Sequence, residues 1–157
     1  MKAISLWQPW ATLVMNGAKQ IETRGRNCTY RGEFAVHAAK HWTYEQRDLC
    51  LTEPFFSILR DAGYITRSRS GLHVVDLPVG RILGMATLAD TKPTEQLHTI
   101  SDQERAFGNY APGRHGYLLR DNRPLRRPIA CGGRQAVPFD VPSNVEAKIR
   151  EQLGGAA

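Results

Sequence analysis

The order and spacing of the apolar segments constrain the fold of this chain more than any other feature of its sequence. Segments typical of strands are separated by connections of unequal length, several of them short and one of them long. A doubly wound parallel sheet requires a helix between successive strands, and this irregular order does not provide it. We therefore predict an α/β fold of the mixed (α+β) kind, a small β-barrel with helices at its rim.

A first helix is predicted over residues 8–16, followed by a strand over residues 19–24 (KQIETR). Apolar residues recur with helical spacing in the first segment, and Gly17 provides a usual helix stop. Side chains alternate across a strand, so Glu22 and Arg24 share one face. Because the other face is needed for the core, we expect this pair to point towards the first helix.

Further strands are predicted in the rest of the chain. Residues 32–39 (GEFAVHAA) form one, which can pair readily with the strand at 19–24. Residues 81–90 (RILGMATLAD) are mostly apolar and predict a central strand, approached closely by another element at its glycine. Residues 116–120 predict another strand, followed by a turn rich in proline and arginine and a short last strand over 135–141.

Capping-box patterns, in which a serine or threonine precedes a glutamine or glutamate by three positions, predict three more helix starts. Pro54 breaks or kinks the first of these helices. The polar and basic stretch at residues 66–72 is predicted to be a mobile loop. The capping pairs are Thr43 with Gln46, Ser101 with Glu104, and Ser143 with Glu146.

The charge balance points to a polyanionic partner. The chain has 21 lysines and arginines against 15 aspartates and glutamates, a net charge of +6, and 16 of the basic residues are arginines. A guanidinium offers phosphate a planar fork of donors and can stack on bases, so this bias favours nucleic acid. Solubility alone remains the alternative explanation.

Composition and length exclude several other classes. A chain of 157 residues has the usual size of one domain, and we predict a single domain over residues 1–157. No apolar run reaches the length of a membrane span, and the start lacks a signal-peptide pattern, so we expect a cytoplasmic protein that does not contact membranes. The cysteines and histidines show no metal-ligand spacing, so neither a metal nor another cofactor is expected.

Five motifs, ISLWQPWA, GAKQIETR, YRGEFAVHAAK, VGRILGMATLAD and FGNYAPGRHGYLL, occur in this order and are followed by a strand that contains Pro-Ile. Taken together they resemble the ASCH family, and the similarity runs from about residue 4 to about residue 138. The most specific element is G-x-K-x-x-E-x-R, formed here by Gly17, Lys19, Glu22 and Arg24.

The resemblance implies a PUA-like barrel of five or six strands with a cleft beside the first helix. Members of the family are thought to bind RNA or DNA, and relatives include an amidohydrolase acting on N4-acetylcytidine and proteins with ribonuclease activity. Tyr117 stands where many relatives have tryptophan, and the segment after Gly133 lacks a tryptophan that often closes the domain. Residues 43–80 form an insertion, with a helix and a mobile basic loop at 66–73, and residues 154–157 are predicted to be a frayed tail.

The charged residues of the GAKQIETR motif have two possible roles. If Lys19, Glu22 and Arg24 converge on a cleft, the lysine and the glutamate could transfer protons while the arginine holds a phosphate or an oxyanion. Alternatively, the glutamate and the arginine form a structural ion pair and the lysine is a solvated surface residue.

Other candidate ligand-binding residues flank this motif. Trp7 could stack on an extruded base and Gln8 could read its edge, whereas Trp10 lies on the apolar side of the helix. A histidine at position 37, in an apolar strand, is more typical of a satisfied core residue than of a ligand. Phosphate or base contacts are expected from Arg26, Lys40, Arg114 and Tyr117.

An arginine cluster follows the strand at 116–120, opposed only by Asp121. It could track a nucleic-acid backbone without reading sequence, or it could be a solvated face. Its members are Arg120, Arg123, Arg126, Arg127 and Arg134.

We therefore predict a domain that binds RNA or single-stranded DNA and whose cleft accepts a base or a modified nucleoside. The alternative is a hydrolase, an N4-acylcytidine amidohydrolase or a ribonuclease, with Lys19 and Glu22 as catalytic residues. In both cases these two residues and Arg24 should line one concave pocket, together with Trp7 or Gln8 and with Arg114 or Tyr117. The sequence leaves the oligomeric state open.

Overall fold

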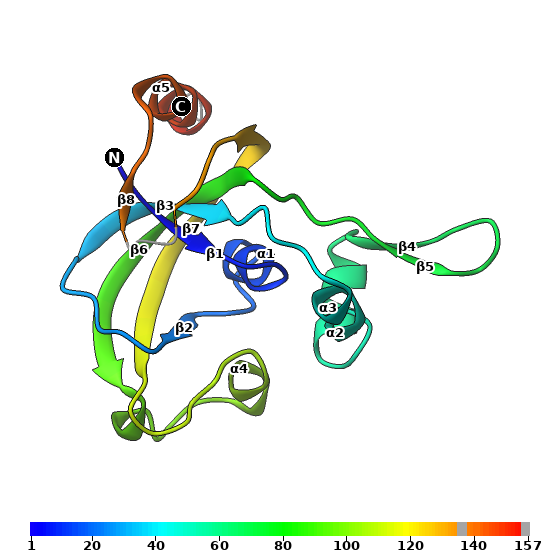
Figure 1. Ribbon diagram of the computed structural model, residues 1–157, viewed down its shortest axis with the longest axis horizontal. Coiled ribbons are helices and arrows are strands. Elements are labelled where there is room, and N and C mark those ends of the chain that lie inside the picture. Colours follow the sequence, from blue (N-terminus) through cyan, green and yellow to red (C-terminus); the bar gives the residue numbers. More distant parts are fainter. Residues whose placement is uncertain (135–137, 155–157) are drawn as a thin grey trace.

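A mostly antiparallel sheet of six strands forms the centre of the molecule (Figure 1). The structure, a computed structural model, describes residues 1–134 and 138–154. The strand order is β2-β7-β6-β3-β1-β8, and β1 runs parallel to β3. The strands are β1 (Lys2–Leu6), β2 (Ile21–Arg24), β3 (Gly32–Ala38), β6 (Arg81–Pro93), β7 (His115–Ala130) and β8 (Phe139–Asp140).

The mixed class is confirmed, but the sheet does not close into the predicted barrel. Within the described residues, β2 and β8 are its two edges and do not pair with each other. β2 has four residues and pairs with the first part of β7, while β8 has two residues and pairs with the start of β1. Such short edge strands offer too few backbone groups to complete a closed ladder.

One expectation about strand pairing was wrong, and one strand was not predicted. The segments at 19–24 and 32–39 do not pair, because β2 lies at one edge beside β7 whereas β3 lies between β6 and β1. The strand β1 was missed, although Ile4 and Leu6 alternate into the core as strand residues do. β1 pairs in parallel with β3. It therefore occupies an edge of β3 that the segment at 19–24 would have needed for a hairpin.

The helix α1 (Trp10–Met15) covers one face of the sheet, and α5 (Ser143–Gly154) covers the opposite face (Figure 1). The predicted close approach at the central strand is confirmed. A Cβ at Gly84 of β6 would lie 2.5 Å from the carbonyl oxygen of Arg123 and 2.5 Å from the sulfur of Met15. Glycine is therefore needed where α1 and β7 meet β6.

The region between β3 and β6 contains α2 (Tyr44–Leu49), α3 (Phe55–Asp61) and a hairpin of β4 (Ile65–Arg67) with β5 (His73–Val75). The predicted capping box forms between Thr43 and Gln46, and Pro54 precedes the first residue of α3. Figure 1 shows the hairpin extending away from the central sheet. The predicted loop at 66–72 thus begins within strand β4, because its polar residues pair across the hairpin.

The remaining elements correct the prediction after residue 120. A 3₁₀ turn, η1 (Thr94–Gln96), and α4 (Asp102–Ala106) precede β7, which continues through the predicted turn. The second half of β7 contains prolines, which cannot donate a backbone hydrogen bond. The strand tolerates them because its pairing with β6 shifts register there and because no described strand pairs with its other edge along this half.

Of the last predicted strand, residues 135–137 lie outside the described residues, and Phe139–Asp140 form β8. Residues 155–157 of the predicted tail also lie outside the described residues. Among the described residues, no helix combines the length and the apolar character needed to cross a membrane.

Candidate functional site

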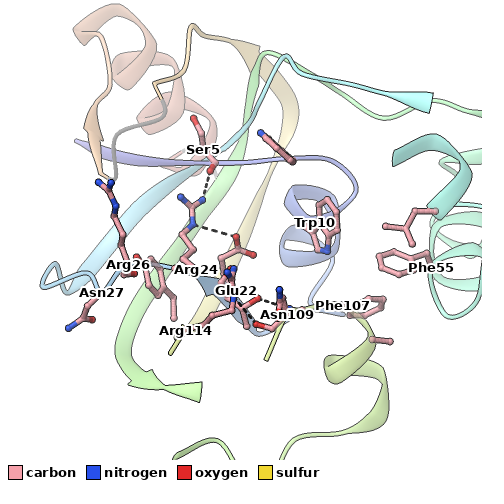
Figure 2. A pocket seen from close by; sticks show the side chains of 17 residues that line it. Ser5, Trp10, Glu22, Arg24, Arg26, Asn27, Phe55, Phe107, Asn109 and Arg114 are labelled. Atoms are coloured by element: carbon pink, nitrogen blue, oxygen red, sulfur yellow. Dashed lines mark hydrogen bonds and ion pairs between the residues drawn. The ribbon is translucent and has the colours of Figure 1, made fainter. Parts of the chain in front are cut away.

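A cleft of about 880 Å³ opens between α1, β2 and the end of α4 (Figure 2). One wall is aromatic and comes from the start of α1, from α3 and from α4, whereas the floor comes from β2 and the start of β7. Its lining consists of Ser5, Trp7, Trp10, Glu22, Thr23, Arg24, Gly25, Arg26, Asn27, Leu49, Phe55, Ala106, Phe107, Gly108, Asn109, Arg114 and Tyr117.

The register of β2 on β7 positions the charged residues of the floor. Glu22 lies opposite Tyr117 in the antiparallel pairing, and Arg24 lies opposite His115. Both Glu22 and Arg24 line the cleft, with side chains that are 16% and 21% exposed. The expectation that alternation along this strand directs the pair towards α1 is therefore confirmed.

The guanidinium of Arg24 is held from two sides. Its Nη2 donates to the carbonyl oxygen of Ser5 at 2.5 Å, and its Nε lies 3.4 Å from Oε1 of Glu22 (Figure 2). Nε is buried and has no hydrogen-bond partner among the described residues. The glutamate and the arginine thus form an ion pair, as the structural interpretation expected, and the pair also lines the cleft.

Arg114 crosses the end of β2 and is fixed by backbone groups. Its Nε donates to the carbonyl oxygen of Asn109 at 3.1 Å, and Nη2 donates to that of Thr23 at 3.3 Å. Neither bond neutralises the guanidinium charge, and no carboxylate forms an ion pair with it within the described residues. A fixed, unneutralised guanidinium at the edge of a cleft is a suitable anion contact.

Tyr117 anchors the chain beside the cleft. Its hydroxyl donates to the carbonyl oxygen of Arg26 at 2.7 Å, and burial raises the pKa of this phenol. The ring is almost completely buried, so its contribution is chiefly structural. Arg26, held at its backbone, keeps an exposed side chain at the cleft's rim.

Lys19 does not line the cleft, which corrects the predicted geometry. Its side chain is 0% exposed, and Nζ donates to the carbonyl oxygens of Ile21 at 2.5 Å and Phe107 at 3.1 Å. Two carboxylates lie nearby, Glu104 at 3.7 Å and Glu22 at 4.0 Å. Burial lowers the pKa of Lys19, and the two carboxylates oppose that shift. The lysine was expected at the surface or in a cleft and is instead enclosed beneath it.

Glu104 was missed as a residue of this region. Its carboxylate accepts hydrogen bonds from the backbone N–H groups of Gln20 at 2.8 Å and Ile21 at 3.1 Å. The capping pattern was the available signal, and it is half fulfilled, since the Ser101 hydroxyl accepts from the Glu104 N–H at 3.1 Å. Through these two bonds the Glu104 carboxylate links α4 to the start of β2, which is more than 80 residues away in the sequence.

Gln8 and Lys40 also lie outside the lining of the cleft. Gln8 is buried, donates to Thr12 Oγ1 and to the carbonyl oxygen of Pro78, both at 2.8 Å, and accepts from the Thr12 N–H. With its amide satisfied in this way, Gln8 joins α1 to the segment before β6 and cannot read a base. Lys40 is exposed, and a Cβ at Gly80 would lie 3.8 Å from the Cβ and Cγ of Lys40.

Trp7 is the exposed aromatic of the site, whereas Trp10 is half-buried beside it. The Trp7 side chain is 47% exposed and lines the cleft at the end of β1. Trp10 faces Phe55 and Phe107 across the cleft (Figure 2). The two phenylalanines were missed because their positions depend on how the α2–α3 region and α4 fold onto α1.

Ser5 presents its backbone carbonyl to Arg24, while its side chain bonds elsewhere. The carbonyl of Cys131 can only accept, so His37 donates to it from Nε2 at 3.0 Å, and the Ser5 hydroxyl donates to Nδ1 at 2.9 Å. Burial lowers the pKa of His37. The interpretation of this histidine as a satisfied core residue is confirmed.

The remaining predicted groups lie away from the cleft. In the arginine cluster, Arg120 pairs with Asp121 at 3.4 Å, Arg123 pairs with Glu33, and none of its members lines the cleft. The three cysteines are buried free thiols. Within the described ranges, histidines, cysteines and carboxylates form no group of three or more that could hold a metal ion.

Comparison with known proteins identifies one family and several similar solved structures. Residues 4–126 match the model of the ASCH domain family. The crystal structure of ASCH from Zymomonas mobilis is similar, with a TM-score of 0.51 and 17% identity, covering 96% of this chain and 93% of that one. A mutant of the same protein gives the same TM-score and identity, with 96% of each chain covered. No curated protein sequence matches this chain.

The chain belongs to the ASCH family, since the family model spans most of its length. The resemblance inferred from the five motifs is thus confirmed, and the family is associated with RNA binding. At 17% identity the similarity to the solved structures shows a shared fold.

Proposed function

We propose that this ASCH protein binds single-stranded nucleic acid, RNA or DNA, and that its cleft accepts one base or modified nucleoside. The observation that carries the proposal is the composition of the cleft. An exposed indole, a carboxylate and fixed guanidinium groups line one concave site of about 880 Å³, a size typical of small-ligand pockets.

Each group has a role in this proposal. Trp7 and Trp10 provide surfaces on which a base can stack. The Glu22 carboxylate can accept from amino or imino N–H groups of a base, while Arg24 can donate to its ring nitrogen or carbonyl acceptors. Arg114, which has no described carboxylate partner, is suited to a phosphate oxygen. The net charge of +6 favours the same polyanionic partner.

Fluorescence anisotropy with labelled single-stranded RNA and DNA tests the proposal. Binding should weaken as salt rises, since each neutralised phosphate adds about 0.7 to the slope of log affinity against log salt on single strands. Substituting Arg114→Ala should reduce the affinity about tenfold, the loss expected of a hydrogen bond to a charged group worth about 1.5 kcal/mol.

Arg69→Ala is the matched control, because Arg69 is exposed in the β4–β5 hairpin, outside the cleft. It should bind as the wild type does. Binding to no oligonucleotide, or binding that does not respond to salt, would contradict the proposal.

A hydrolase acting on N4-acylated cytidine or on RNA remains a second candidate, and one feature favours it. The Glu22 carboxylate lines the cleft, where it could act as a general base, and the buried Lys19 ammonium lies 4.0 Å away as its ion-pair partner. In that case Glu22 would contact the substrate and Lys19 would act through it, because Lys19 is enclosed.

Product analysis after incubation with N4-acetylcytidine and with short RNA distinguishes the two candidates. The hydrolase requires turnover that Glu22→Gln abolishes while binding is retained. Binding without turnover of either substrate supports the binding module and contradicts the hydrolase.

A further inference from the structure

We propose that Trp7 and His41 form a second nucleotide site outside the mouth of the cleft, with Lys40 as its phosphate contact. This inference rests on the proposed function and deepens it. The partner is then an extended single strand of at least two nucleotides, and a free nucleoside fills only part of the site.

The two rings form a surface that is open to solvent. Their centroids lie 5.0 Å apart, with an angle of 41° between the planes. Trp7 is 47% exposed and His41 is also exposed. Single-stranded nucleic acids are bound on such exposed aromatic surfaces because every base has a face to stack.

The backbone holds this surface next to the cleft. The N–H of Ala39, just after β3, donates to the carbonyl oxygen of Leu6 at 2.8 Å, which ties the two chain segments together where β1 and β3 end. The residues that follow, Lys40 and His41, are therefore brought beside Trp7. Because Trp7 also lines the cleft, a strand with one base in the cleft has its neighbouring base within reach of this surface.

The charges around the surface formed by Trp7 and His41 suit a nucleic-acid strand that crosses the cleft. Lys40 is exposed and has no ion-pair partner among the described residues. Arg26 is exposed among the lining residues, next to Asn27, and likewise has no such partner in the described chain. Phosphates on either side of the inserted base could contact these two side chains.

One nearby charge opposes the proposed ligand and sharpens the test. The pKa of Glu45 is lowered by hydrogen bonds with its own backbone and with Thr43 at the start of α2, and to a smaller extent by His41. Glu45 lies in the first turn of α2, four residues after His41, so its charge is close to the surface along the chain. Neutralising it with Glu45→Gln should strengthen oligonucleotide binding, by less than the loss caused by Lys40→Ala.

The experiment compares ligands of increasing length at constant salt. UMP and TMP are measured by NMR titration, and uridine or thymidine oligonucleotides of two, three and six residues by the same method or by anisotropy. We expect affinity to rise at least tenfold from the mononucleotide to the trinucleotide. His41→Ala and Lys40→Ala should each remove about three- to tenfold of this increase and leave mononucleotide binding unchanged.

His98→Ala and Lys148→Ala are the matched controls, since both side chains are exposed and lie outside the cleft lining. They should behave as the wild type. If the mononucleotide binds as tightly as the hexanucleotide, or if the His41 and Lys40 variants match their controls, the second site is refuted while the cleft proposal stands. If neither mononucleotides nor oligonucleotides bind, both proposals fail.

Discussion

Lys19 and Arg24 belong to the same short motif, yet their environments differ completely. The lysine is enclosed, with carbonyl oxygens on its ammonium group and two carboxylates nearby. The arginine lines an open cleft and retains a buried Nε without a hydrogen bond. Glu22 lies between them and contacts both. The first part of the motif therefore stabilises the fold, and the second part presents charge to a ligand.

The physical difference lies in desolvation. A buried ammonium group must be compensated by fixed partners, and Lys19 has carbonyl oxygens and carboxylates that meet this need. A partly exposed guanidinium remains hydrated and can exchange water for a ligand. Substitutions in the two regions should consequently separate stability from binding.

The largest effect is expected from Lys19→Met. It removes the cation from between Glu104 and Glu22 and leaves carbonyl oxygens unpaired, so the free energy of unfolding should fall by about 3 to 5 kcal/mol. Urea denaturation followed by circular dichroism measures this change. Lys148→Met, on the exposed face of α5, is the control. If both variants are equally stable, the buried region does not stabilise the fold as described.

Arg24→Met should produce the opposite pattern. Loss of the guanidinium should reduce oligonucleotide affinity by tenfold or more, since hydrogen bonds to charged groups are worth about 1.5 to 3 kcal/mol. Stability should fall by less than in Lys19→Met, because Arg24 is partly exposed, and its lost partners are the Ser5 carbonyl, which lies beyond the pairing of β1 with β8, and the Glu22 carboxylate. Anisotropy and urea denaturation on the same samples check the separation. Normal affinity with greatly reduced stability would reverse the comparison.

Acid should weaken the buried region through His37. Burial lowers the pKa of His37 in the folded protein, so between that value and the ordinary 6.5 the unfolded chain binds more protons than the folded one. Stability from this group is therefore lost as pH falls below about 6.5. Urea midpoints from pH 7 to pH 5 should fall less steeply in His37→Asn than in the control His98→Asn.

The smallest effect is expected at the rim of the cleft. Arg26→Ala removes an exposed charge, so stability should change by less than about 0.5 kcal/mol. Affinity should fall a few-fold, and the slope of log affinity against log salt should decrease by about 0.7, corresponding to one phosphate contact. Arg69→Ala should leave the slope unchanged. An equal slope in both variants would exclude Arg26 as a phosphate contact.

Much of the local structure was predictable because its signals are local. The capping box at Thr43 and Gln46 formed as its sequence predicts, and the glycine at position 84 marks a place where only a hydrogen fits. The alternation along β2 placed Glu22 and Arg24 on one face. The strand pairings were less predictable, since β2 pairs with a segment far along the chain rather than with the next strand.

The sequence by itself determined the family, the mixed class and the face on which the β2 charges lie, because motifs, caps and alternation act within a few residues. Only the tertiary structure decided which charges are buried. Glu104 and the carbonyl of Phe107 reach Lys19 from α4 and its end, and the Pro78 carbonyl takes the amide of Gln8 away from any ligand. The desolvation of a side chain depends on atoms brought together from distant parts of the chain, and neither its own identity nor that of its neighbours in sequence specifies them.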